Sequence, residues 1–556
     1  MKRALLCGVL LVWGAGLVLL QTTPPATKLA AWMPSGALIY LESPDFGRLM
    51  RDWDSSKVKA DWLNSDNYAA FSRSNLFTKL AEVYGQYGEA AGFAPGLKSV
   101  MEIAGTDSAL ALYEIREAEF LYITRIGDAE LAKAQLWAVR DKFERREAGG
   151  VSFYLRTDPA SKRTVAFVFA KGYLLLATRD DLMAQALELL GGGSKPSIAS
   201  DRWYSESTAA AGGRGKLRMA LNVESLVKSV YFRSYWIQRN ASMVRRYWAE
   251  TADVKLAPGS ITETRVLLRA PDPASAGVEP AGDAVSSLLE WVPPEAGVYK
   301  VSRACEPADA AGLIVEKLIG PQRQRVGDWR RAPMPVPADD RAGSEGDLET
   351  RIDEQPLPPD EGRADATGAV RELVEKTGCR AWMSVQQSST AGPFVEMPAV
   401  IAVNGEHEWD GNAVSAALGT AAGKLWSTSQ LGARWVGGTE GQHPVKRLNG
   451  LGVLIFAASG RLLFISNDVR FLTAVLDRRG AKAPSATLVY AAGFRHLREH
   501  INYERVMRAL EPEPHGLFSD NIGSLSRVLA SVREVRVAQE EHGGRTYETV
   551  TYEMRP

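Results

Sequence analysis

The hydrophobic positions of the chain alternate between the period of a strand and the period of a helix. Apolar runs at 165–170 (VAFVFA) and 452–458 (GVLIFAA) predict buried strands, and a glycine suited to a hairpin turn follows each run. A second strand comes next, and then an apolar-periodic helix, at 183–190 (MAQALELL) and 471–479 (FLTAVLDRR). The pattern strand, turn, strand, helix therefore occurs twice, and it predicts an α+β fold built on antiparallel sheet.

Residue identities also agree between the two halves of the chain. Trp32–Tyr40 and Trp291–Tyr299 share Trp, Pro, Ala and Tyr at identical spacing, with an offset of 259 residues (291 − 32). Gly172–Leu182 matches Gly460–Arg470 with an offset of 288 residues (460 − 172). Between these segments, a strand predicted at 119–126 leads into a helix at 129–147, and a strand predicted at 399–404 leads into a helix at 412–429. Because the intervening strands and helices follow the same order, the sequence predicts two tandem divergent copies of one antiparallel sheet-plus-helix module.

The two predicted modules occupy residues 29–275 and 276–556, and the second contains an insertion. The offset between the matching segments grows by 29 residues (288 − 259) along the chain. The stretch 321–368 accounts for this growth, since it is rich in Pro, Gly, Asp and Glu and poor in apolar residues. Such a composition cannot bury enough apolar surface to offset chain entropy, so a disordered loop is predicted there.

The corresponding region of the first module is aromatic rather than acidic. Trp53, Trp62, Tyr68, Phe71 and Phe77 fall in a stretch with a helical pattern. Two interpretations stay open: the rings pack against the module, or they line an aromatic binding groove.

The chain begins with the pattern of a membrane-targeting segment. Lys2 and Arg3 precede residues 4–20, which are apolar and carry no charge. A helix of this length is about 25 Å long, at the short end of what spans a bilayer. The positive flank predicts that the rest of the chain is exported across the bacterial inner membrane. Residues 1–28 are therefore expected to be a signal peptide or an uncleaved signal anchor that tethers a periplasmic or otherwise extracytoplasmic protein to the membrane.

The charge balance and the cysteine count narrow the function classes. The 66 basic and 66 acidic residues leave no net charge, so no overall field favours nucleic acid, and none is expected as a partner. Of the three cysteines, Cys7 falls in the targeting segment and leaves Cys305 and Cys379 as a pair. Disulfides form in exported proteins, and a bond between these two would close the insertion, where loop closure stabilises most.

His496, Glu499 and His500 form the motif H-x-x-E-H on a predicted helix, and its form resembles the inverted zinc motif of one metallopeptidase group. The histidines are four residues apart, so both could bind one Zn²⁺, with Glu499 as the general base. Against this, the equivalent region of the first module keeps neither histidine, and the surrounding run is as densely charged as a solvated helix face. The metal and catalytic roles are therefore an alternative hypothesis, and the leading expectation is a chain with no catalytic site and no cofactor.

Both modules share a Pro-led opening strand, a hairpin that begins with glycine, and a following helix, at 34–40, 172–178, 293–299 and 460–466. This arrangement resembles large exported bacterial proteins of a domain-of-unknown-function family with tandem α+β repeats. The resemblance implies envelope localisation and an α+β fold, and it implies no particular enzymatic activity. The expected function is a non-enzymatic binding or scaffolding role in the cell envelope, with envelope proteins as partners. A zinc-dependent hydrolase and a carrier of a lipid or other hydrophobic ligand are the two alternatives.

Overall fold

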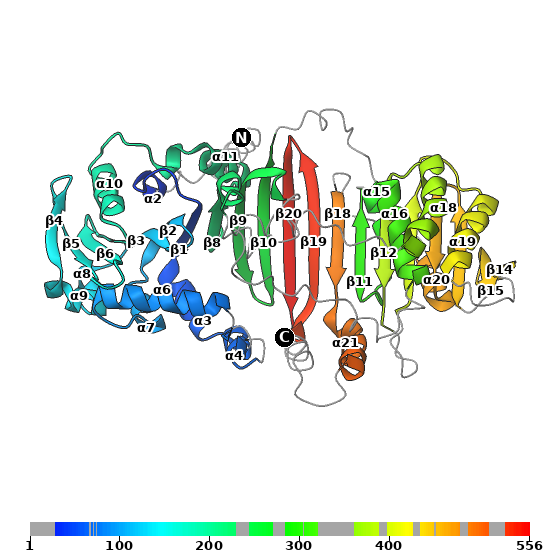
Figure 1. Ribbon diagram of the computed structural model, residues 1–556, viewed down its shortest axis with the longest axis horizontal. Helices are drawn as coiled ribbons and strands as arrows, with labels where there is room; N and C mark the ends of the chain where they lie inside the picture. The colour runs from blue at the N-terminus through cyan, green and yellow to red at the C-terminus, as the bar shows by residue number, and fades with distance from the viewer. Residues whose placement is uncertain are drawn as a thin grey trace, which may run out of the picture. The chain divides into compact units, whose positions relative to one another are not determined.

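The computed structural model of the 556-residue chain describes most of the sequence beyond residue 27 (Figure 1). The described residues are 28–65, 68, 69, 72, 73, 75–229, 244–270, 284–303, 305–320, 361–388, 397–425, 434–449, 452–478, 488–510 and 529–555. Nearly all of the predicted signal peptide or anchor, and residues 321–360 of the predicted insertion, lie outside them. Among the described residues, no helix is both long enough and apolar enough to cross a membrane.

The described chain is mixed α+β with a large antiparallel sheet, which confirms the prediction of an α+β fold built on antiparallel sheet. Its contacts divide it into two compact units. The first unit comprises Met1–Ser55, Asn75–Lys255 and Arg265–Leu268, and the second comprises Ser56–Ser74, Leu256–Thr264 and Arg269–Pro556.

The first ladder of antiparallel strands runs in the spatial order β4-β5-β6-β7-β3-β2-β1-β8-β9-β10 (Figure 1). Its strands are β1 (Ile39–Asp45), β2 (Thr106–Glu114), β3 (Glu119–Arg125), β4 (Glu144–Ala148), β5 (Val151–Thr157), β6 (Thr164–Ala170), β7 (Tyr173–Ala177), β8 (Leu217–Leu221), β9 (Tyr247–Ala257) and β10 (Ser260–Arg269). The predicted hairpin with glycine at its turn is β6–β7, where Gly172 has a φ of 81° that favours glycine.

The second ladder runs in the order β14-β15-β16-β17-β13-β12-β11-β18-β19-β20. Its strands are β11 (Val298–Ser302), β12 (Ala381–Gln386), β13 (Ala399–Asn404), β14 (Arg434–Glu440), β15 (His443–Asn449), β16 (Val453–Ser459), β17 (Leu462–Ser466), β18 (Leu488–Phe494), β19 (Val532–His542) and β20 (Arg545–Met554). Taken in chain order, each strand of this ladder has the same neighbours as the corresponding strand of the first ladder.

Helices lie on both faces of the first ladder. The helical segments of the first unit are α2 (Lys28–Ala31), α3 (Phe46–Asp54), α6 (Asn75–Ala91), α7 (Leu97–Glu102), α8 (Asp128–Leu131), α9 (Gln135–Ala138), η1 (Arg140–Lys142), α10 (Asp180–Leu190), η2 (Ile198–Ser200), α11 (Arg202–Ala211) and α12 (Val223–Leu226), whereas α4 (Lys57–Leu63) belongs to the second unit. Tyr204 of α11 meets Tyr40 edge to face, with ring centroids 5.0 Å apart. Phe46 of α3 meets Tyr122 on the opposite face of the sheet, at 6.2 Å.

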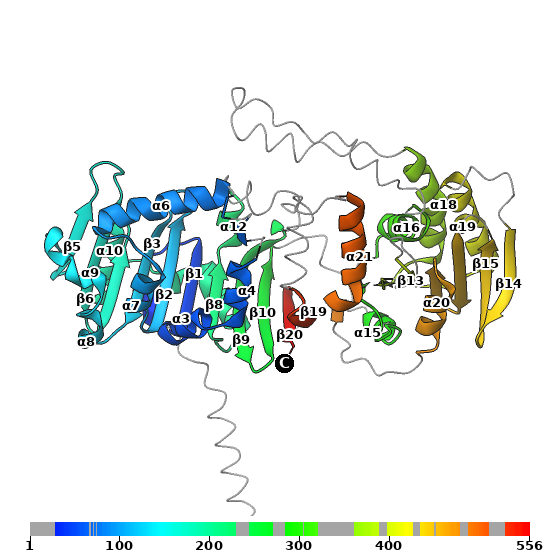
Figure 2. The same ribbon diagram turned by 90° about the horizontal axis from the view of Figure 1, so that it is seen from below.

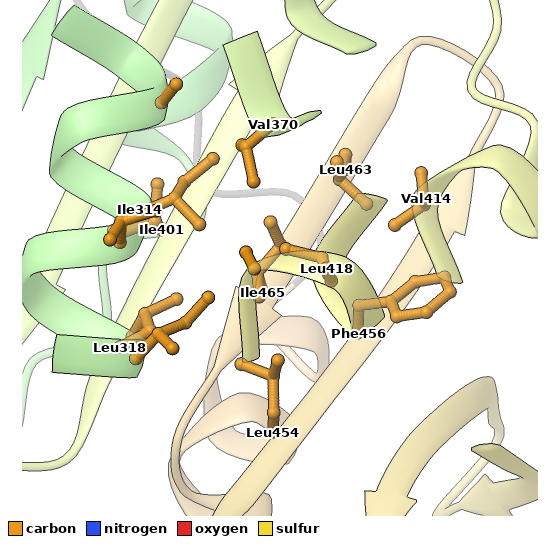
Figure 3. Close-up of a cluster of buried hydrophobic side chains, with 14 of the residues drawn as sticks. Ile314, Leu318, Val370, Ile401, Val414, Leu418, Leu454, Phe456, Leu463 and Ile465 are labelled. Carbon is orange, nitrogen blue, oxygen red and sulfur yellow. The ribbon is translucent and has the colours of Figure 1, made fainter. Parts of the chain in front are cut away.

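The second unit has a packed apolar cluster on each face of its sheet. Its helical segments are α15 (Ala284–Leu289), α16 (Pro307–Ile314), η5 (Val315–Ile319), α18 (Glu361–Thr377), α19 (Gly411–Leu425), α20 (Val469–Leu476) and α21 (His496–Leu510). On one face α15 and α20 pack against Val400 and Phe464. On the other face α16, α18 and α19 close over Ile401 and Ile465 (Figure 3).

Two details differ from the sequence predictions. The stretch 129–147 reads as one helix in sequence but forms α8, α9, η1 and most of β4, because pairing of β4 with β5 overrides the helix propensity of its charged residues. The insertion is shorter than 321–368, since α18 begins at Glu361 and buries Ala366 and Val370, an i, i+4 pair, in the core.

Candidate ligand-binding site

An apolar hollow of about 230 Å³ lies between the sheet of the first unit and the helices α3 and α7. These helices and α6 occupy the lower edge of this unit in Figure 1, and Figure 2 views them from that side. The lining comes from five strands and two helix ends: Leu41, Glu42, Ser43, Phe46, Val100, Ile103, Ser108, Ala109, Leu110, Phe120, Tyr122, Leu176 and Leu217. This cavity is called the apolar hollow below.

The floor of the apolar hollow follows from the alternation of side chains along strands. Successive residues of a strand point to opposite faces, and residues paired across a ladder point to the same face. Leu41 pairs with Leu110, Leu110 with Tyr122, and Tyr122 with Leu176. These four residues therefore form one row across β1, β2, β3 and β7, while the neighbouring Tyr40 is fully buried on the other face.

The roof is fixed by a close approach of two backbone segments. Asp45 begins α3 by accepting a hydrogen bond from the Arg48 backbone N–H at 2.9 Å, which places Phe46 over the floor. The Gly47 N–H donates to the Gly105 carbonyl at 2.9 Å. A Cβ on Gly47 would lie 2.5 Å from the Ala104 carbonyl oxygen, so any side chain there would push α3 away from the α7–β2 connection.

The apolar hollow has a closed end and an open side. Ser43 and Ser108, which pair across β1 and β2, are buried, whereas Leu41 and Leu110 in the next row are only half-buried. The helices that form the roof also carry apolar side chains that face solvent, since Trp53 on α3 is 43% exposed and Leu97 on α7 is 40% exposed. Of the predicted aromatic stretch, Phe71 lies outside the described residues.

The polar groups at the closed end are bonded within the protein. The Ser43 Oγ donates to the Lys216 carbonyl at 2.8 Å, and the Oγ of Ser108 lies 2.6 Å from the Thr124 Oγ1. The Tyr122 hydroxyl donates to the Ile103 carbonyl at 3.1 Å, and burial raises the pKa of this phenol. The interior of the hollow is therefore apolar, and it offers a ligand van der Waals contacts rather than hydrogen bonds.

A buried charge network lies on the other face of the sheet, on the side of Tyr40. Glu42 accepts a hydrogen bond from the Tyr40 hydroxyl at 3.0 Å, and a guanidinium nitrogen of Arg214 lies 3.7 Å from the same carboxylate. In the next strands Arg218 and Asp253 form a buried ion pair at 2.7 Å. Because each of these charges has a partner, the network stabilises the strand ends rather than presenting a charge to the apolar hollow.

The corresponding face of the second unit has different chemistry. The match of Tyr40 with Tyr299 makes Lys300 the counterpart of Leu41, and Lys300 pairs with Ser384 just as Leu41 pairs with Leu110. The Lys300 Nζ lies 5.2 Å from the centre of the Trp382 ring and 5.6 Å from that of Tyr490. Beyond this row the face is filled by packed aliphatic side chains of α16, η5 and α18, among them Ile314, Leu318 and Val370 (Figure 3).

The structure places the H-x-x-E-H residues at the start of α21, directly after β18. Glu499 is 2% exposed, and its carboxylate accepts hydrogen bonds from the Ser388 N–H and Oγ, both at 3.0 Å, and from the Gln386 amide at 3.3 Å. His496 is buried, with its ring centre 6.3 Å from that of His500. The His500 Nδ1 lies 2.9 Å from the Leu497 carbonyl. In this arrangement Glu499 holds the segment that follows β12.

The described residues contain no group of three or more His, Cys, Asp or Glu side chains that could hold a metal ion. A second, polar cleft of about 480 Å³ lies on the other side of the Gly47–Gly105 contact. Its lining mixes both signs of charge, with Arg51 and Arg125 beside Asp45 and Asp128.

Cys305 and Cys379, the pair considered from the sequence, are joined in a disulfide with a Cα–Cα distance of 5.6 Å. The bond ties the segment before α16 to the segment between α18 and β12, and the two cysteines are 74 residues apart. It therefore closes the loop that contains the insertion, next to the apolar cluster of Val374 and Ile314.

No protein-family model and no curated protein matches the sequence. Among solved structures, crystal form I of TP0453 is similar to 45% of this chain over 83% of its own length, with 13% identity and a TM-score of 0.25. Crystal form III of TP0453 is similar to 50% of this chain over 90% of its own length, with 12% identity and a TM-score of 0.26.

The sequence suggests a carrier of a hydrophobic ligand as one alternative, but that prediction names none of the residues that line the apolar hollow. The signal that was present is the pair of strands at 39–45 and 106–114, in which Leu41 and Leu110 lie on the face opposite Tyr40. Whether a helix fills the space above such a row depends on how closely the helix approaches the sheet. That approach is set by Gly47 and Gly105, which are far apart in the sequence.

Proposed function

We propose that the protein is a non-enzymatic binding protein of the cell envelope and that it binds a hydrophobic ligand in the apolar hollow of its first unit. The observation that supports this most directly is the apolar hollow itself, with aliphatic and aromatic walls and internally bonded polar groups. An apolar cavity that remains empty forfeits contacts on every wall, so a ligand that fills it gains both burial and dispersion energy.

We further propose that residues 4–20 carry the chain across the bacterial inner membrane and tether it there, and that the two units are divergent copies of one module. The tether is supported by the charge-free apolar run after Lys2 and Arg3. The duplication is supported by the two matching sequence segments and by the same strand order in the two ladders. A ligand with a hydrocarbon part suits this location, since a bilayer is the source of such ligands.

A photoreactive probe tests the binding proposal. The full chain is held in an amphipathic polymer, irradiated with an octyl diazirine, and digested, and the labelled peptides are identified by mass spectrometry. The expected labels lie in β1, β2 and α7, and Leu110→Trp, which fills the apolar hollow, should remove them. Lys300→Leu, at the position of the second unit that corresponds to Leu41, is the matched control and should keep them. Labelling that is spread over both units, or that survives Leu110→Trp in a folded protein, would refute the proposal.

A further inference from the structure

We infer that the apolar hollow takes a single unbranched hydrocarbon chain of about eight to ten carbons, inserted tail first, and that the first unit alone supplies this site. The inference rests on the proposed function, because it specifies the ligand of the same hollow. Three observations carry it: the volume of the hollow, the chemistry of its closed end, and the contrast with the second unit.

The volume sets the length of the chain. A cavity of roughly 150 Å³ holds one benzene ring, which has six carbons. The apolar hollow measures about 230 Å³, which on the same scale corresponds to roughly nine carbons. A sterol or a pair of acyl chains is much larger than this space, whereas one alkyl chain fits between the floor residues Leu41 and Leu110 and the roof residues Phe46 and Val100.

The closed end sets the direction of insertion. The hydroxyls of Ser43, Ser108 and Tyr122 already have partners in the protein, at 2.8, 2.6 and 3.1 Å. A polar head group placed there would lose its hydration without gaining a hydrogen bond, so the methyl end of the chain enters first. The head group then stays on the open side, beside the half-buried Leu41 and Leu110.

The described residues of the second unit show different chemistry at the corresponding row. Lys300 and Ser384 replace the apolar pair Leu41–Leu110, and the ammonium group of Lys300 lies over Trp382. A hydrocarbon chain on this row would have to displace a charged group from an aromatic face. Among the described residues, the apolar row that a hydrocarbon chain needs is therefore found in the first unit, and the corresponding face of the second unit is packed with aliphatic side chains.

The experiment measures how 1-alkanols from hexanol to tetradecanol compete with the octyl diazirine for the full chain. Each added methylene should strengthen competition about fourfold until the hollow is full, and the gain should stop at about eight to ten carbons. Ile103→Ala enlarges the closed end and should move this break by about two carbons to longer chains; Val100→Ala is the second enlarging variant, used if the first does not fold. Lys300→Leu should leave the break where it is.

The outcomes separate this inference from the proposed function. Three results would overturn the single-chain inference while the binding function stands. The first is an affinity gain that continues to tetradecanol, and the second is a break that stays in place in a folded enlarging variant. The third is competition by naphthalene but by no alkanol. If neither an alkanol nor the probe binds in the hollow, the single-chain inference and the proposed binding function are both wrong. A further arm compares decanoate with decanoyl lysophosphatidylcholine, a phospholipid with one acyl chain, both as monomers. Competition by decanoate alone identifies a free amphiphile as the source, and competition by the phospholipid identifies a membrane lipid; either supports the chain.

Discussion

Leu41→Lys is the change that tests the apolar hollow most directly, because the protein already carries Lys300 at the corresponding position of its second unit. Leu41 stands in the row Leu41–Leu110–Tyr122 and is half-buried against the hollow. The lysine stem can lie along the floor and turn its ammonium group toward the open side, so the fold should persist at a cost of about 1 kcal/mol.

The expected effect on binding is much larger than the effect on stability. A bound hydrocarbon chain loses its contact with the leucine side chain, equivalent to roughly two methylenes or about 1.6 kcal/mol. It must also exclude water from a charged group, which adds at least about 1 kcal/mol. Together these costs, about 2.6 kcal/mol or more, predict a loss of affinity for octanol or decanol of roughly 80-fold or more.

The assay is competition of decanol against the octyl diazirine on the full chain, with thermal unfolding as the check on folding. Lys300→Leu is the matched control: it loses a cation–π contact and should leave ligand affinity unchanged. If a folded Leu41→Lys protein bound decanol with wild-type affinity, the hydrocarbon chain would not lie on this row, and the proposed site would be wrong.

Three further predictions concern stability and metal. Replacing Cys305 and Cys379 by serine should lower the unfolding free energy of the second unit by about 2–4 kcal/mol in denaturant titrations and leave decanol affinity unchanged; equal stability with and without reductant would contradict this. Glu499→Ala leaves the Ser388 N–H without its acceptor and should cost about 1–3 kcal/mol, whereas Glu499→Gln should cost less; stoichiometric zinc that is lost in both variants would instead favour the hydrolase. Burial raises the pKa of Tyr122, so its contribution to stability is complete below the unfolded pKa near 10 and is lost as the pH rises further; a Tyr122→Phe protein should show a smaller loss in urea titrations between pH 9 and 11.

The sequence by itself determined the local elements and their order. Strand alternation and glycine-led hairpins gave β13 at its observed bounds, Ala399–Asn404, and gave the β6–β7 and β16–β17 hairpins. These elements depend on patterns of a few neighbouring residues, which a sequence displays directly. The composition also marks the acidic insertion, but α18 begins within its predicted bounds, because Ala366, Val370 and Val374 recur at helical spacing in an otherwise polar stretch.

Only the tertiary structure decided which of these elements enclose a space. Whether β4 forms within 129–147 depends on a partner strand rather than on its own residues. The surroundings of Glu499 depend on Ser388, more than one hundred residues away, whose backbone N–H donates to the buried carboxylate. The apolar hollow exists because Gly47 and Gly105 hold α3 at one distance from the floor. Packing distances of this kind are set by residues from distant parts of the chain, and no local pattern records them.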